Sequence, residues 1–125
     1  MVRESRILFL STQEGGAKTE YESAKPLAYQ LKSKIIHAHA PEDDHALQDG
    51  LHSALLENHV IVVEPKGKTK ALLDALVDAM AGMDPIARVV PLPKGFSREA
   101  MSRFLENELK AYRLQNRDLR KSKEM

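Results

Sequence analysis

The chain has 125 residues, of which 42% are hydrophobic and 30% charged, with a formal net charge of +1. These values suit one folded globular domain and exclude a wholly disordered chain. The chain has no cysteine, which excludes disulfide scaffolds, thiolate catalysis and cysteine-based metal sites. No apolar run reaches the roughly 20 residues of a membrane span, and residues 1–6 have no signal-peptide character. We therefore expect a cytoplasmic protein without membrane contact.

Four short apolar runs predict four β-strands. The runs cover residues 7–10, 35–38, 60–63 and 87–90. The first and third are continuously apolar and rich in branched side chains, as in strands that are covered on both faces. We therefore expect these two in the middle of a mostly parallel sheet with the strand order 2-1-3-4.

Segments between and after these runs carry apolar residues at helical spacing. The stripes cover residues 24–31, 47–55, 72–80 and 101–112. For the first helix, Ser23 is the expected N-cap, and Pro26 is tolerated in the first turn. Single helices that alternate with strands predict a three-layer α/β fold of the flavodoxin-like or Rossmann-like kind. We expect one domain over residues 1–115, followed by a basic tail, 116–125, that is frayed or disordered.

A ligand site is expected where the strand order reverses, beyond the carboxyl ends of the first and third strands. Two loops follow these strands, residues 11–20 and 64–69. The first is long for a strand-to-helix connection and offers hydroxyls and glycines, and the second offers lysines at a helix start, which suits an anion. We expect a small, nucleotide-like ligand that bears a phosphate or a ribose, and no cofactor. The ligand residues would be Ser11, Thr12, Gly15, Gly16, Thr19, Lys66, Lys68 and Thr69.

The sequence Gly67-Lys68-Thr69 matches the end of a phosphate-binding P-loop, which needs another glycine five residues before the last one. That position is Val62, inside the predicted strand, so an NTPase of this type is excluded. Simpler alternatives remain for both loops. The lysine-rich turn is then a solvated helix start, and the loop over residues 11–20 is a mobile surface loop without a ligand.

Three histidines are candidate metal ligands. His37 and His39 are two residues apart on a predicted strand and point the same way. His45 follows in the next helical turn, where we expect it to approach them. The acids at 42–44 are also typical of a helix start, and the spacing matches no known ligand motif. We therefore expect no metal, and partly solvated histidines on an edge strand are the alternative.

Residues 49–63, followed by a polar loop and a helix, resemble the middle of Toll/interleukin-1-receptor-like domains and of nucleoside 2-deoxyribosyltransferases. Both families cleave N-glycosidic bonds with a glutamate on that helix, where the nearest acid here is Asp74. They typically have a fifth strand, which this chain lacks. The resemblance implies a flavodoxin-type fold and, as a third alternative, a hydrolase or transferase of N-glycosidic bonds. Glu64, which ends the third strand, is the other candidate catalytic acid.

Charge is distributed unevenly along the chain. Residues 40–64 contain six acids and no lysine or arginine, and residues 110–125 contain six bases and two acids. The near-neutral total gives no general attraction to nucleic acid, so we expect no such partner.

A last helix over 98–118 would be roughly 30 Å long, and Tyr112, Leu114 and Leu119 would then project past the sheet. The second functional hypothesis is therefore a non-catalytic interaction module that forms a homodimer through this helix. A helix end that frays in solvent is the simpler alternative.

Overall fold

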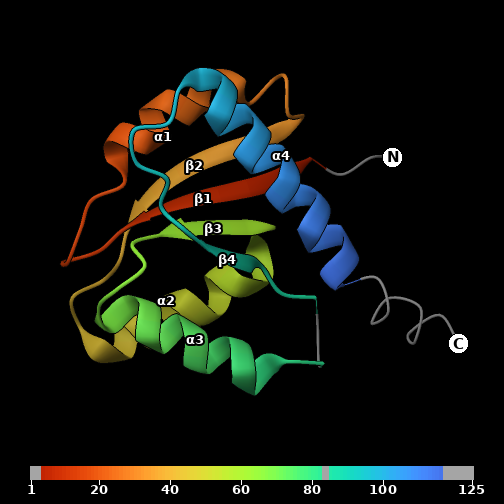
Figure 1. Ribbon diagram of the computed structural model, residues 1–125. Helices are drawn as coiled ribbons and strands as arrows, with labels where there is room; N and C mark the ends of the chain where they lie inside the picture. Colours follow the sequence, from red (N-terminus) through yellow and green to blue (C-terminus); the bar gives the residue numbers. More distant parts are fainter. Residues whose placement is uncertain (1–3, 83–84, 117–125) are drawn as a thin grey trace, which may run out of the picture.

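The protein is a four-stranded sheet between two layers of helices (Figure 1), and the computed structural model describes residues 4–82 and 85–116. The strands are β1 (Ser5–Ser11), β2 (Ser33–His39), β3 (Val60–Val63) and β4 (Arg88–Pro91). The helices are α1 (Lys18–Ala24), α2 (Asp44–Glu57), α3 (Lys68–Met80) and α4 (Arg98–Gln115), and a short 3-10 helix, η1 (Lys25–Leu27), directly follows α1. Among the described residues, no helix is long and apolar enough to cross a lipid bilayer.

All four strands are parallel, in the order β2-β1-β3-β4. β1 pairs with β2 along its whole length, with Ser5 opposite Ser33, and pairs with β3 on its other side, with Ile7 opposite Val60. The expected α/β class, strand order and long last helix are therefore confirmed. The strand order reverses between β1 and β3, and in open α/β sheets ligands generally bind beyond the carboxyl ends of the strands at such a point.

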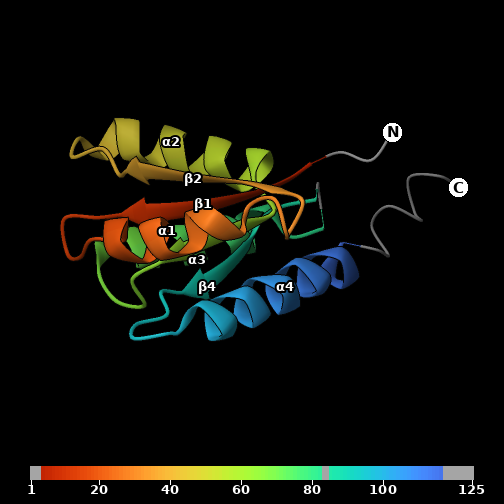
Figure 2. The ribbon, with the colours of Figure 1, turned by 90° about the horizontal axis from the view of Figure 1, so that it is seen from above.

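Alternate residues of the central strands face two separate cores. Ile7 and Phe9 on β1 pack toward α1 and α4, whereas Leu8 and Leu10 pack toward α2 and α3. Figure 2 shows α2 and α4 on opposite sides of β1 and β2. Every residue of β3 is fully buried, because each face of the sheet is covered by helices.

Side-chain caps begin two of the helices. Asp43 accepts a hydrogen bond from the Ala46 backbone N–H at 2.9 Å and begins α2. Ser97 accepts one from the Ala100 backbone N–H at 3.1 Å and begins α4. Such caps satisfy backbone donors that have no partner inside the helix. The predicted start after Ser97 is confirmed, and within the acidic stretch Asp43 serves as the N-cap.

The first helix differs from the prediction. α1 begins at Lys18, so Ser23 lies inside it and is not its N-cap, and the helix ends before Pro26. Proline has no backbone N–H, and its ring clashes with the carbonyl four residues earlier, so it cannot continue an α-helix. The chain passes instead into η1, which has Pro26 in its first turn. The apolar residues of the stripe still face the core through Ala24 and Leu27.

The end of α4 is tied to the rest of the fold. The Tyr112 ring packs on the His59 ring with a centroid separation of 4.5 Å. Asn116, which ends α4, accepts a hydrogen bond from the backbone N–H of Ile86 at 3.3 Å. The expectation that Tyr112 projects past the sheet was therefore wrong. Leu114, two residues later, is 68% exposed. Leu119 and the other residues of the expected basic tail after Asn116 lie outside the described residues.

Candidate functional site

The two loops that the sequence nominates meet at the carboxyl ends of β1 and β3. The carboxylate of Glu14, in the loop after β1, accepts a hydrogen bond from the backbone N–H of Lys68 at 3.0 Å. Gly67, just before α3, has a φ of +112°, and an added Cβ would lie 2.7 Å from Cγ of Glu14. Glycine is therefore required here for both its conformation and its lack of a side chain. The loop after β1 and the loop after β3 therefore lie in contact, as the sequence predicts.

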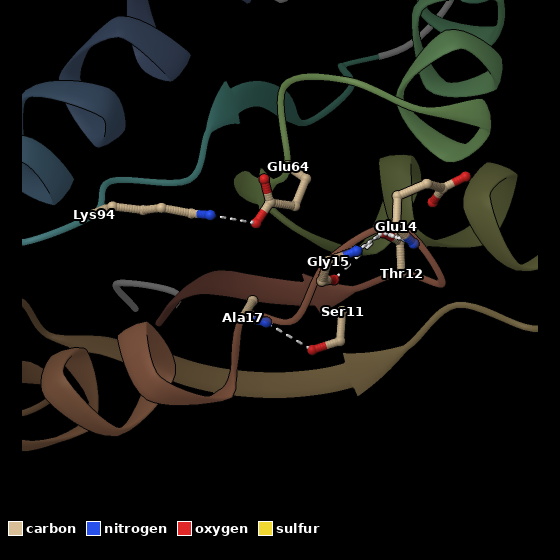
Figure 3. Close-up of polar contacts among 7 residues, drawn as sticks. All are labelled: Ser11, Thr12, Glu14, Gly15, Ala17, Glu64 and Lys94. Carbon is tan, nitrogen blue, oxygen red and sulfur yellow. Dashed lines mark hydrogen bonds and ion pairs between the residues drawn. The ribbon is translucent and has the colours of Figure 1, made fainter.

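Hydrogen bonds within the loop after β1 give it a fixed shape (Figure 3). The Thr12 hydroxyl accepts from the backbone N–H groups of Glu14, at 3.2 Å, and Gly15, at 3.1 Å. Ser11 Oγ accepts from the N–H of the buried Ala17 at 2.8 Å. The hydroxyls of Ser11 and Thr12 therefore hold the loop and are already engaged with it.

This loop is shorter than the sequence indicates. Ser11 belongs to β1 and Thr19 to the first turn of α1, so the connection comprises only residues 12–17. That length is within the usual range of roughly 2–6 residues for such loops, so the expectation of an unusually long loop was wrong. The cause is the early start of α1 at Lys18, which the apolar stripe beginning at Ala24 does not reveal.

A carboxylate of the protein itself, that of Glu14, is bound at the amino end of α3. The backbone N–H of Lys68, which donates to the Glu14 carboxylate, lowers the pKa of Glu14, so this side chain stays ionised at neutral pH. A helix amino end favours negative charge because its first N–H groups have no partner in the helix. Lys68 itself pairs with Asp44, and this hydrogen bond raises the pKa of Lys68. The Glu14 carboxylate thus lies at the helix start where we expected the anionic group of a ligand.

Glu64 lies at the end of β3, directly above the first loop. Its carboxylate forms an ion pair with Lys94 at 3.1 Å, and its side chain is only 16% exposed. A Cβ on Gly15 would lie 2.5 Å from Cγ of Glu64, so a larger residue here would displace the Glu64 side chain. Figure 3 shows Glu64 between Gly15 and Lys94. The structure thus brings Lys94 to the site from the loop after β4.

The remaining candidates differ in how close they lie to this edge of the sheet. Gly16 is open, with no atom within 4 Å of an added Cβ, and Thr69 is buried in the first turn of α3. Asp74 lies further along α3, where its carboxylate pairs with Lys70 at 2.8 Å. Of the two candidate catalytic acids, Glu64 therefore lies at the site and Asp74 is engaged elsewhere.

The histidines do not assemble as the sequence indicates. The rings of His37 and His39 are 4.9 Å apart, on the face of β2 toward α1, where His37 also stacks on Tyr21. Burial, followed by the charges of His39 and Lys18, lowers the pKa of His37. His45 lies in the first turn of α2, which covers the opposite face of the sheet. Residues 4–82 and 85–116 contain no group of three or more histidine, aspartate or glutamate side chains that could hold a metal ion. The expected approach of His45 was wrong.

Sequence reasoning missed Glu14 and Lys94, and both bring charge to the site. Beside Glu14 lies a cavity of about 10 Å³ between the loop after β1, the start of α3 and residues 40–42, with room for about one water molecule. No family model, curated protein or solved structure matches the chain.

Replacing Ser11 with alanine should lower the free energy of unfolding by about 1–3 kcal/mol, because the buried N–H of Ala17 loses its acceptor. Urea unfolding monitored by circular dichroism measures this change. Ser5→Ala is the matched control. Ser5 is also buried on β1, but its hydroxyl makes no hydrogen bond among the residues that the structure describes. Equal losses in the two variants would contradict this role of Ser11.

Proposed function

We propose that the protein binds a small ligand bearing a phosphate or a ribose at the carboxyl ends of β1 and β3. One observation carries the proposal: a carboxylate, that of Glu14, is bound at the amino end of α3. This end of the helix therefore suits an oxyanion, and the phosphate of a ligand would take the place of the Glu14 carboxylate. Backbone N–H groups at a helix start commonly bind phosphate in this way.

Other groups at this edge complement such a ligand. Lys66 is exposed beside the start of α3, and Lys68 lies at its first position. Gly16 leaves open space in the first loop, and the exposed Thr19 offers a hydroxyl to a ribose. In this proposal Ser11 and Thr12 position the loop through their hydrogen bonds and do not contact the ligand themselves. The carboxylate of Glu64, held by Lys94, lies at the same edge and can accept hydrogen bonds from ribose hydroxyls.

Reversing the charges of Lys66 and Lys68 tests the proposal. Isothermal titration calorimetry with ribose 5-phosphate should give an affinity at least about tenfold lower for K66E/K68E than for the wild type. The physical reason is the replacement of two positive charges beside the phosphate with two negative ones. K25E/K34E carries the same change in net charge away from the site and should bind as the wild type does. Equal affinities for K66E/K68E and K25E/K34E would overturn the proposal, provided that both variants melt cooperatively.

A second candidate function is self-association through α4. Leu114 near the end of this helix is 68% exposed, and it follows Arg113, a residue type favoured in interfaces. The proposal is a homodimer in which the basic end of α4 faces the acidic α2 region of the second copy. This arrangement does not depend on a ligand at the other end of the sheet.

Light scattering at tens of micromolar tests this homodimer. We expect the mass of two chains for the wild type and of one chain for Leu114→Asp, since the charge would lie in an apolar contact. Phe96→Asp is the control, because Phe96 is also exposed, at 43%, but lies in the loop before α4, away from both α2 and the end of α4. A wild-type mass of one chain would contradict self-association.

A further inference from the structure

A second cavity lies away from the site described above. It is at the end of the sheet where β2 begins and α4 ends, two elements that can be followed in Figure 1. It is a cavity of about 280 Å³ between the second half of α4 and the turn that follows η1. This volume is near the lower end of the roughly 300–1,000 Å³ typical of small-molecule sites. Its lining residues are Gln30, Leu31, Lys32, Glu106, Leu109, Lys110 and Arg113.

The two walls of this cavity are held together. Gln30 in the turn donates a hydrogen bond from its side-chain amide to Ser102 Oγ of α4 at 3.0 Å. Leu109 is buried in the core between the sheet and α4, and Leu31 packs against the same core. These two leucines at the base of the cavity are therefore continuous with the interior of the protein. A cavity with fixed walls can bind a ligand without a large ordering cost.

Lys32 has an unusual backbone conformation in this wall. Its φ is +52°, and it is the one described residue other than glycine with a positive φ. The backbone N–H of Ser33 donates to the carbonyl of Ala28 at 2.9 Å, and that of Lys32 donates to the carbonyl of Tyr29 at 3.1 Å. This is the pattern of a helix end at which glycine is the usual residue. A lysine in this conformation costs stability, and such strain tends to persist where a side chain has a function.

The charges at the cavity are mainly positive. Lys32, Lys110 and Arg113 contribute three cations, and Glu106 is the one acid among the lining residues. Glu106 lies 3.8 Å from Lys110, and both side chains are largely exposed, so this pair is weak. Within residues 4–82 and 85–116, no carboxylate forms an ion pair with Lys32 or Arg113. The three cations of the cavity therefore have little internal compensation.

We propose that this cavity binds a small organic phosphate, with the doubly charged phosphate between Lys32 and Arg113. A short apolar part of the ligand would rest on Leu31 and Leu109. Arginine matches phosphate oxygens with two parallel N–H donors, and lysine adds a point charge. The site lies at the opposite end of the strands from Glu14 and the start of α3, so it is independent of the ligand site proposed there, whereas it shares Arg113 with the proposed homodimer contact.

Titration of the ¹⁵N-labelled protein with phenyl phosphate, followed by amide chemical shifts, tests the site. We expect shifts at residues 30–32 and 109–113, and affinity about fivefold or more lower in Lys32→Gly and in Arg113→Ala. Lys32→Gly should also unfold at a temperature no lower than the wild type, because glycine suits the positive φ. The loss of binding can then not be attributed to unfolding.

Two further arms make the test specific. Lys34→Ala, which removes an exposed charge on β2 just beyond the turn, should bind phenyl phosphate as the wild type does. Inorganic phosphate should bind more weakly than phenyl phosphate, because it gains nothing from Leu31 and Leu109. Unchanged affinity in Lys32→Gly and Arg113→Ala, or shifts confined to residues 12–16 and 66–69, would overturn the proposal. Equal affinity for the two phosphates would overturn the apolar part of the site.

Discussion

Replacing Phe9 with alanine is expected to lower the free energy of unfolding by about 3–5 kcal/mol. Phe9 lies in the middle of β1 and is fully buried between the sheet, α1 and α4. Its ring meets the Tyr21 ring of α1 edge to face, at a centroid separation of 6.4 Å. The substitution removes the contacts that the ring makes with α1 and α4 in this core. It also leaves a cavity, because the close-packed residues around the ring relax only partly.

Urea unfolding measures this loss, and Phe96→Ala is the matched control. Phe96 lies in the loop before α4 and is 43% exposed. Because much of its ring is already in water, we expect a loss well below that of Phe9→Ala. A change of less than about 1 kcal/mol for Phe9→Ala would contradict the position of β1 in the centre of the fold.

Replacing Glu14 with alanine is expected to raise the affinity for ribose 5-phosphate roughly tenfold. In the wild type the Glu14 carboxylate is bound at the amino end of α3, and a ligand phosphate must displace it. The side chain thus reduces the fraction of molecules that are ready to bind, and its removal restores that fraction. The N–H group of Lys68 and the adjacent positive charges stay in place.

Isothermal titration calorimetry on Glu14→Ala and on Glu20→Ala measures this effect. Glu20→Ala removes the same charge from the first turn of α1, and we expect it to change the affinity by less than about twofold. A lower affinity in Glu14→Ala would show that this carboxylate contacts the ligand favourably. An unchanged affinity would show that the ligand binds elsewhere. Either result would contradict the proposed exchange.

The sheet could be predicted because burial on both faces leaves a direct trace in the sequence. The continuous run of Val60 to Val63 is fully buried in β3, and only a central strand of a parallel sheet needs such a run. Alternation of strands with helices then sets the right-handed crossovers. The strand order then determines where the proposed ligand site is expected.

The bounds of the first helix could not be predicted, because the apolar stripe runs from the end of α1 through η1 into the turn that follows it. Ala24 ends α1, Leu27 ends η1, and Leu31 lies in the turn beyond, yet all three face one core. The spacing alone therefore indicates one helix. Pro26 was the available signal, since it marks the end of an α-helix more often than its beginning when other helical residues precede it.

The charges of the candidate site were only partly visible in the sequence. That two loops meet follows from the strand order, but that Glu14 binds Lys68 depends on the exact shape of a loop fixed by Thr12. A glutamate 54 residues from its backbone partner leaves no periodic signal. The glycines were the indirect signal, because Gly15 and Gly67 each leave room for a glutamate side chain.

The central claim is that a phosphate-bearing ligand binds where β1 and β3 end, in place of Glu14. Amide chemical shifts of ¹⁵N-labelled Glu14→Ala during titration with ribose 5-phosphate test it most directly. The account predicts saturable shifts at residues 12–16 and 66–69, including the N–H of Lys68 that Glu14 engages in the wild type. Saturable shifts that leave both of these segments unmoved would contradict it, as would a complete lack of shifts at millimolar ligand.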